Sequence, residues 1–139
     1  MLFPKKVKHR KWHTMRTNPK KLGVATRGIE VSFGQFGLKA TSSARVTSQQ
    51  IEAARKAMVR EAGKLARVWI RIFPDYPITK KAAEVPMGNG KGDLQGYQVQ
   101  VLPGRVIFEL DGITEAVAKE ALRKAGTKLP VKSKVVTRD

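Results

Sequence analysis

The residues with the clearest chemistry are a run of cations between positions 5 and 27. This stretch holds nine lysines and arginines and no acid, and the first acid along the chain is Glu30. His9, Trp12 and His13 stand among the cations and supply flat rings that can stack on bases. Because such a run repels itself and has little apolar surface, it needs a polyanion to order it. Cations for phosphates and rings for bases together predict a basic extended nucleic-acid-binding arm over residues 1–27.

The candidate RNA-binding residues form two groups, one in the arm and one in the rest of the chain. The arm group is Lys5, Lys6, Lys8, His9, Arg10, Lys11, Trp12, His13 and Arg16. The second group is Arg45, Arg55, Lys56, Arg60 and Arg71. We expect the cations to neutralise phosphates and Trp12 to stack on a base. The alternatives are a solvated tail for the arm, a solvated helix face for residues 55–60, and packing of Trp12 on the body of the protein.

The composition bounds the class of protein. The chain has 139 residues, with 28 lysines and arginines against 11 acids, and a formal net charge of +17. Its hydrophobic content of 41% suffices for one folded domain behind the arm, over residues 28–139. The absence of cysteine excludes disulfides, thiolate zinc sites and cysteine nucleophiles. No apolar run approaches the roughly 20 residues that a membrane helix needs, so we expect a cytoplasmic protein without membrane contact.

No constellation of residues for catalysis or cofactor binding is evident. His9 and His13 have the spacing of metal ligands on a helix, but neither a helix nor a third ligand supports a site. Glu109 and Asp111 alternate along one expected strand without a histidine or serine nearby. We therefore predict no enzyme activity, no metal and no cofactor, and interpret the scattered acids as a buffer for the basic surface.

A glycine loop is expected at residues 86–93. It contains Met87, Gly88, Asn89, Gly90, Lys91 and Gly92. A phosphate-binding P-loop would need a serine or threonine after the lysine, and Gly92 stands there instead. Two interpretations remain open. The segment is a plain flexible connection, or its backbone approaches RNA closely because glycine has no side chain.

The hydrophobic pattern predicts the helices that position these residues. Thr47 and Gln50 form a capping box at the start of a helix whose buried face recurs at three- and four-residue steps. That face comprises Ile51, Ala54, Met58, Ala62 and Leu65. A second helix is capped by Thr114 and ends before Gly126. Its inner face comprises Val117, Ala118, Ala121, Leu122 and Ala125.

Short apolar and β-branched runs predict the strands. They lie at residues 28–33, 36–40, 68–73, 97–101, 105–110 and 131–137, with a weakly extended stretch at 78–86 and a polar loop at 41–46 that exposes Arg45. The runs at 97–101 and 105–110 resemble a hairpin. The whole pattern predicts an α+β fold in which two helices pack on a mixed β-sheet.

Six segments along the chain match one known family in the expected order. They are Pro4–Lys5 with Arg10–His13, Val31–Ala40, Gln50–Met58, Trp69–Asp75 with Pro77–Thr79, Met87–Gly92 and Lys128–Lys132. These segments span nearly the whole chain and resemble the bacterial large-subunit ribosomal protein L-sixteen family. The resemblance implies an α/β hammerhead-like arrangement of two helices on a mixed sheet.

The resemblance also implies a function. The protein would be a non-catalytic constituent of the large ribosomal subunit that binds 23S-type rRNA near the peptidyl-transferase centre and the aminoacyl-tRNA site. It would contact tRNA, through the loop at 86–93, and support translation and late subunit assembly. Its partners would be rRNA, tRNA and neighbouring ribosomal proteins, with no homo-oligomer, in a cytoplasmic or an organellar ribosome. The alternative is a basic architectural DNA-binding protein, although no dimer seam, recognition helix or minor-groove wedge is evident.

Two departures from the family pattern are visible. Pro86 stands where we expect an arginine that some members hydroxylate, so we predict that this modification is absent. Segment 14–27 is a few residues longer than the pattern, so the contacts of its cations do not follow from the resemblance.

Overall fold

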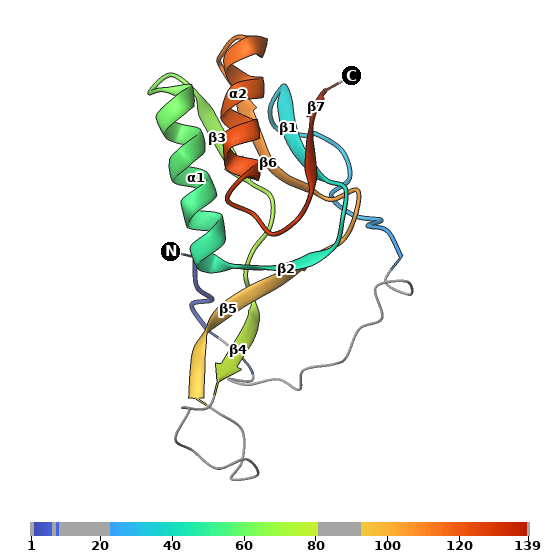
Figure 1. The fold of residues 1–139 in the computed structure, drawn as a ribbon, viewed down its shortest axis with the longest axis vertical. Helices are drawn as coiled ribbons and strands as arrows, with labels where there is room; N and C mark the ends of the chain where they lie inside the picture. Colours follow the sequence, from blue (N-terminus) through green and yellow to red (C-terminus); the bar gives the residue numbers. More distant parts are fainter. Residues whose placement is uncertain (1, 7, 9–22, 81–92, 139) are drawn as a thin grey trace.

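The protein, seen in a computed structural model, has two helices and two β-sheets in the part of the chain that the structure describes (Figure 1). The described residues are 2–6, 8, 23–80 and 93–138. The elements are β1 (Phe36–Ala40), β2 (Ala44–Thr47), α1 (Ser48–Ala62), β3 (Arg67–Ile70), β4 (Tyr76–Lys80), β5 (Asp93–Val101), β6 (Val106–Asp111), α2 (Glu115–Gly126) and β7 (Ser133–Thr137). Sheet A has the strand order β3-β6-β1-β7, and sheet B has the order β2-β5-β4.

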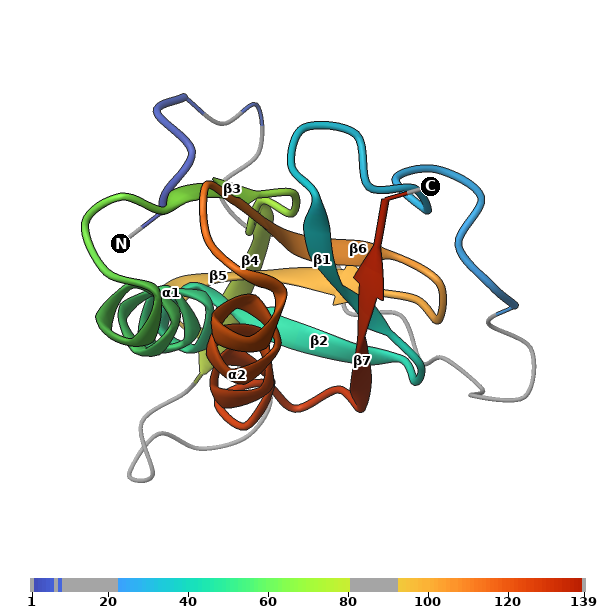
Figure 2. The same ribbon diagram turned by 90° about the horizontal axis from the view of Figure 1, so that it is seen from above.

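Sheet A lies between the two helices and a loop segment. The helices α1 and α2 run side by side and cover one face of the sheet, while segment 23–35 lies over the opposite face (Figure 2). Gly37 of β1 shows how closely the segment approaches, because a Cβ atom there would lie 2.8 Å from Cγ2 of Val31. Sheet B extends from the N-terminal end of α1 away from these layers (Figure 1).

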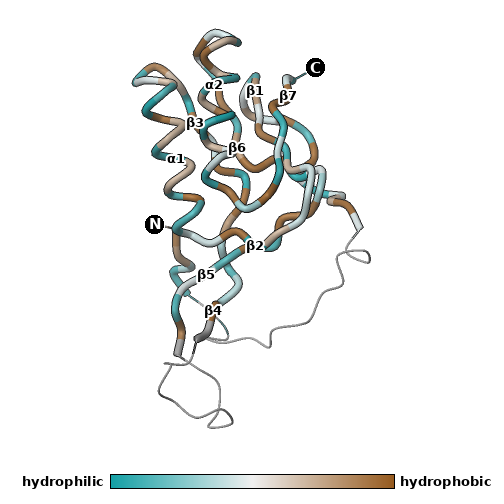
Figure 3. The backbone as a smooth tube through the Cα atoms, in the orientation of Figure 1, coloured by the Kyte–Doolittle hydropathy of each residue, from teal (hydrophilic) through white to brown (hydrophobic). Residues whose placement is uncertain are grey.

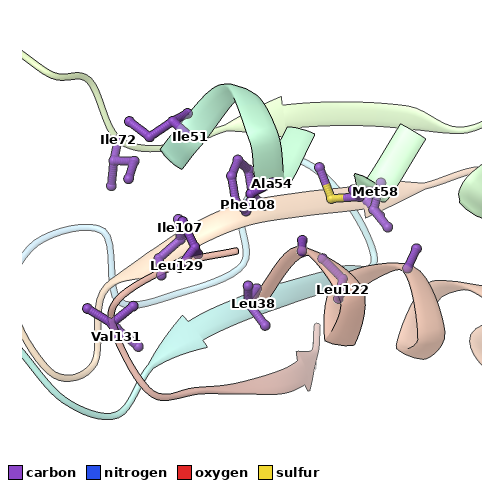
Figure 4. Packing of buried hydrophobic residues seen from close by; sticks show 14 of the residues in the cluster. Leu38, Ile51, Ala54, Met58, Ile72, Ile107, Phe108, Leu122, Leu129 and Val131 are labelled. Carbon is purple, nitrogen blue, oxygen red and sulfur yellow. The ribbon is translucent and has the colours of Figure 1, made fainter. Parts of the chain in front are cut away.

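The hydrophobic core fills the space between sheet A and the helices. Leu38 and Phe108 project from β1 and β6 toward Ile51 and Met58 of α1 and Leu122 of α2 (Figure 4). Each of these five side chains is at most 1% exposed. Both helices alternate between hydrophilic and hydrophobic positions along their length, as amphipathic helices do (Figure 3). Burial of one such side chain is worth roughly 1.5–3 kcal/mol, so this layer holds the body together.

The predicted capping box at the start of α1 is confirmed. Thr47 Oγ1 accepts a hydrogen bond from the Gln50 amide at 3.2 Å, and Gln50 Oε1 accepts one from the Thr47 amide at 2.9 Å. The predicted buried face is confirmed at Ile51, Ala54 and Met58, and Ala62 is partly buried. The prediction is wrong for Leu65, which is 86% exposed, because the helix has already ended at Gly63 with a φ of +86°.

The second helix also lies where the sequence predicts it, with two differences. Thr114 occupies the N-cap position, but its side chain makes no capping hydrogen bond. Gly126 is the last residue of the helix rather than the first beyond it. The predicted inner face is confirmed at Ala118, Ala121, Leu122 and Ala125, whereas Val117 is 37% exposed.

The strands confirm the α+β class but not a mixed sheet, because every strand pairing in the described residues is antiparallel. Residues 28–33 form no strand and belong to the loop over sheet A, and the expected loop at 41–46 contains most of β2. The predicted hairpin of β5 and β6 is wrong. Residues 106–110 are buried on both faces, which places β6 between β3 and β1 inside sheet A, while β5 pairs with β2 and β4.

Candidate nucleic-acid interface

The arm begins at a fixed point on the body of the protein. Leu2 packs against the hydrophobic core, and the Phe3 ring meets the Tyr97 ring of β5 edge-on, with centroids 6.0 Å apart. The described arm cations Lys5, Lys6 and Lys8 are exposed. The other predicted arm residues, His9, Arg10, Lys11, Trp12, His13 and Arg16, lie outside the described residues. The first residues therefore contact sheet B, and the described cations that follow are open to a partner.

The ends of the glycine loop are set by sheet B. β4 and β5 pair with each other as far as Lys80 and Asp93, so segment 81–92 joins two adjacent strands. This pair of strand ends lies at the end of sheet B farthest from the helices (Figure 1). Pro86 and the predicted tRNA-proximal residues Met87, Gly88, Asn89, Gly90, Lys91 and Gly92 lie outside the described residues. Their contacts stay a prediction.

The three predicted cations of α1 differ in their surroundings. Arg55 donates to Glu52 from Nη2 at 2.5 Å and from Nε at 3.2 Å. The hydrogen bond from Arg55 lowers the pKa of Glu52, and the reciprocal contact raises the pKa of Arg55. Lys56 and Arg60 are exposed and have no acid in salt-bridge range among the described residues. A phosphate can reach these two directly, whereas at Arg55 it would compete with Glu52.

Arg45 lies on β2 in sheet B, where it is half-buried. Its guanidinium carbon is 5.1 Å from the centre of the Tyr76 ring, which is a cation–π geometry, and its Nε is 3.4 Å from Gln100 Oε1. The prediction of an exposed arginine in a polar loop is therefore wrong in both respects.

Arg71, just after β3, is held by the body of the protein. Its guanidinium pairs with Glu109 Oε2, donates to the Glu30 carbonyl at 3.3 Å, and lies 4.9 Å from the centre of the Phe33 ring. Only 17% of the Arg71 side chain is exposed. A role in RNA binding stays a prediction for Arg71. The structure shows that its guanidinium already has a carboxylate, a carbonyl and an aromatic ring of the protein itself as partners.

Glu109 is the centre of this arrangement and is fully buried. Its Oε1 accepts hydrogen bonds from the backbone amides of Ser32 at 2.9 Å, Phe33 at 2.8 Å and Gly34 at 3.0 Å. Burial alone would raise the pKa of Glu109, but the hydrogen bonds from the Gly34 amide, Arg71 and the Phe33 amide outweigh it and lower the pKa. The interpretation of the acids as a surface buffer is wrong for Glu109, and we call this carboxylate with Arg71 and the amides of residues 32–34 the Glu109 anchor.

Arg105, which the sequence did not single out, fixes the same loop from its other end. It donates from Nη2 to the Arg71 carbonyl at 2.8 Å and from Nη1 to the Arg27 carbonyl at 3.3 Å. Burial, followed by the nearby charge of Arg71, lowers the pKa of Arg105. A Cβ atom at Gly28 would lie 2.8 Å from this guanidinium, and the φ of +64° at Gly28 favours glycine there. Two arginines and one carboxylate thus hold the polypeptide between the arm and β1.

A further group of cations near the C-terminus was also missed. Lys128, Lys132, Lys134 and Arg138 are all exposed, and residues 127–138 contain no acid. This acid-free run was the available signal. Lys39 of β1 belongs to the same group, because the strand register places it directly opposite Lys134 of β7.

The acids on the helices, in contrast, are all neutralised by nearby cations. The pairs are Glu52 with Arg55, Glu61 with Lys124, Glu115 with Lys119, and Glu120 with Arg123, at 2.5–3.0 Å. Each helix has three cations and two acids, so its net charge is only +1. The surface charge is therefore balanced over much of the helix layer and unbalanced along β7.

The described residues contain no group of three or more histidines or acids that could hold a metal ion. Within the same residues, no helix is both long and apolar enough to span a bilayer. A groove of about 510 Å³ lies between segment 29–32 and the end of β7. It is a shallow depression with Glu30, Lys39 and Arg138 among its lining residues, not an enclosed cavity.

A small basic α+β body with exposed cations that lack acidic partners is typical of a structural nucleic-acid-binding protein. The family model described as "Ribosomal protein L16p/L10e" matches residues 4–136. The chain belongs to this family, which consists of structural ribosomal proteins and not of enzymes.

Curated relatives match over nearly their full length. A protein of Rhodopseudomonas palustris (strain BisB18) is 55% identical over 138 residues, which cover 99% of this chain and 98% of that protein. One of Sulfurihydrogenibium sp. (strain YO3AOP1) is 56% identical over 136 residues, or 98% and 96% of the two chains. One of Afipia carboxidovorans is 51% identical over 138 residues, or 99% and 98%. Each of these relatives is named large ribosomal subunit protein uL16.

Proposed function

We propose that this protein is a structural constituent of the large ribosomal subunit and binds the 23S-type rRNA of that subunit. The family match over residues 4–136 carries the proposal, since relatives more than half identical in sequence bear the name of one large-subunit protein. The net charge of +17 agrees with it, because a protein this basic needs a polyanion as partner. Its working location is then the ribosome.

The same proposal assigns separate roles to the arm and to the body of the protein. Residues 1–27 act as an RNA-binding arm, and residues 28–139 form the body that docks on rRNA and on neighbouring ribosomal proteins. The arm residues named from the sequence, together with Lys56 and Arg60 of α1, contact phosphates. The protein lies near the peptidyl-transferase centre and the aminoacyl-tRNA site, where the loop at 86–93 reaches tRNA, and it acts as a single copy that also supports late subunit assembly.

The charge part of the proposal is tested by RNA binding at several salt concentrations. The full chain is titrated against a large-subunit rRNA fragment between about 50 and 200 mM salt, and the logarithm of the association constant should fall linearly with the logarithm of salt. A deletion of residues 1–13 removes five lysines and arginines and should flatten this slope. A binding constant that does not respond to salt would refute the electrostatic mechanism.

The location is tested by sedimentation of the tagged full chain from cell extract. Migration with large subunits is expected, and the chain without residues 1–13 should be incorporated less. Duplex DNA provides the counter-test, because an architectural DNA-binding protein would sediment with the nucleoid and bind duplex DNA at least as tightly as the rRNA fragment. That outcome would replace the proposal with the alternative.

A further inference from the structure

Two lysines stand directly opposite each other on adjacent strands of sheet A. Lys39 of β1 pairs with Lys134 of β7 in the antiparallel register. Opposite residues point to the same face of a sheet with their Cβ atoms about 4.5–5.5 Å apart, and like charges in this position are destabilising. Neither lysine has an acid in salt-bridge range within the described part of the chain. The free fold therefore tolerates a local repulsion that an anion would relieve.

These lysines lie on the face of sheet A away from the helices. Leu38 points into the core against α2 (Figure 4), and side chains alternate along a strand, so Lys39 points to the opposite face. Segment 29–32 crosses that same face beside β7 (Figure 2). Lys39 thus lines the 510 Å³ groove between this segment and β7, and Lys134 stands opposite Lys39 on β7.

Arg138 extends the positive charge along the groove. Its backbone is held by Gln35, because the Arg138 amide donates to the Gln35 carbonyl at 2.8 Å and Gln35 Nε2 donates to the Arg138 carbonyl at 3.4 Å. Its exposed guanidinium has no acidic partner among the described residues. Arg138 lies four residues beyond Lys134, about 13 Å along an extended strand. That span suits successive phosphates of a polyanion better than one small anion.

Protection of a sheet edge explains only part of this arrangement. Lysines on an edge strand prevent pairing with other chains, and β7 is an edge strand, so Lys134 fits that role. Lys39, however, lies on β1, which has neighbours on both sides in sheet A. An interior lysine opposite another lysine has no use in edge protection, and it calls for a ligand on the face of the sheet.

We propose that the outer face of sheet A, formed by Lys39, Lys134 and Arg138, docks on the phosphate backbone of large-subunit rRNA. This inference rests on the proposed function and names the part of the body that carries it. The RNA backbone runs along the groove beside segment 29–32, with the three cations on separate phosphates. Among the described residues that line the groove, Glu30 is the acid, and it limits the affinity on the opposite wall.

The test compares the full chain with Lys39→Gln/Lys134→Gln in binding to the rRNA fragment across the same salt range. Each lost phosphate contact lowers the magnitude of the slope of log association constant against log salt by about 0.7–0.9. The slope of the double variant should therefore be smaller in magnitude by about 1.4–1.8. Lys64→Gln/Lys119→Gln removes the same charge from the loop after α1 and from α2, and should keep the wild-type slope. Glu30→Gln removes the acid from the groove and should bind more tightly than wild type.

Stability measurements separate lost binding from lost folding. Because the double variant removes a repulsion, its melting temperature at low salt should equal or exceed that of wild type, with the difference shrinking as salt rises. If the double variant does not fold, Lys134→Gln alone, at an exposed position, should lower the slope by about 0.7–0.9. A folded variant with an unchanged slope overturns the outer face as the docking surface while leaving the proposed function intact. A wild-type chain that fails to bind the rRNA fragment overturns the proposed function itself.

Discussion

Replacing Glu109 by glutamine should destabilise the protein strongly although it changes only one atom of the side chain. In the wild type, one carboxylate oxygen accepts three backbone amides and the other pairs with Arg71. Glutamine can keep the three amides on its carbonyl oxygen, but its NH2 group then faces the Arg71 guanidinium, and two donors cannot bond. The arginine is left without its charge partner in a largely buried place.

The magnitude follows from the burial of the two partners. Removing one member of a buried ion pair costs about 3–5 kcal/mol, because the other charge stays behind uncompensated. Glu109 is fully buried, whereas 17% of the Arg71 side chain is exposed, so water relieves part of the loss. We expect the lower end, about 3 kcal/mol at pH 7, which corresponds to a fall of about 10 °C in melting temperature for a chain of this length.

The pH dependence supplies a second signature. The pKa of Glu109 is lower in the folded protein than its ordinary value. The contribution of ionised Glu109 to the free energy of unfolding is therefore complete above the pKa that the group has in the unfolded chain, about 4.3. It is lost as the pH falls through the lower pKa of the folded protein. Urea denaturation of wild type and Glu109→Gln at pH 7, 5, 4 and 3 should give a gap in unfolding free energy that is constant down to about pH 5 and narrows below it.

The control is Glu115→Gln. The ion pair of Glu115 with Lys119 is exposed and should contribute little to the free energy of unfolding. The double variant Arg71→Gln/Glu109→Gln should be less destabilised than the sum of the two single variants, because it leaves no unpaired charge. The reasoning fails if Glu109→Gln melts together with Glu115→Gln, or if its free-energy gap is as large at pH 3 as at pH 7.

Two further substitutions test the fold that positions the site. Thr47→Ala should lower the unfolding free energy by about 1 kcal/mol in chemical denaturation, since it removes the hydrogen bond to the Gln50 amide, whereas Thr114→Ala should change it less because that side chain caps nothing. Gly34→Ala should cost about 1–3 kcal/mol in the same assay, because its Cβ would lie 2.5 Å from the Leu110 carbonyl oxygen, and an unchanged stability would show that the loop is not held where the structure places it.

Local signals were enough to predict some elements from the sequence. The capping box at Thr47 and Gln50 and the apolar steps of α1 lie within one stretch of chain, and the structure confirms the box and the steps from Ile51 to Met58. The end of α1 was misjudged because the apolar periodicity runs on past Gly63 to Leu65, although the chain has already turned there. Periodicity alone does not mark where a glycine ends a helix.

Contacts between distant residues could not be predicted in the same way. Glu109 lies 77 positions from Ser32, and the lysine pair of β1 and β7 depends on a strand register that no local pattern contains. A weak signal did exist at Glu109, which interrupts the apolar run from Val106 to Leu110. An acid inside a strand buried on both faces must find several hydrogen-bond donors, and here a loop and an arginine supply them.

The Glu109 anchor connects the two parts of the proposed RNA-binding surface. Segment 23–35 includes the last residues of the arm, is held by Glu109 and Arg105, and forms one wall of the groove beside β7. The Ala25 amide also donates to the Pro103 carbonyl at 2.9 Å, so the segment is tied to the body close to residue 23.

A tether fixed near its origin raises the local concentration of the arm at whatever the body has already bound. Once the outer face of sheet A holds the phosphate backbone, the arm has only its own ordering cost to overcome. The chain has 11 acids against 28 lysines and arginines, and burial of the Glu109 carboxylate removes from the surface one negative charge that would repel RNA. The same carboxylate holds in place the segment from which the cationic arm extends, so one residue supports both of the proposed binding elements.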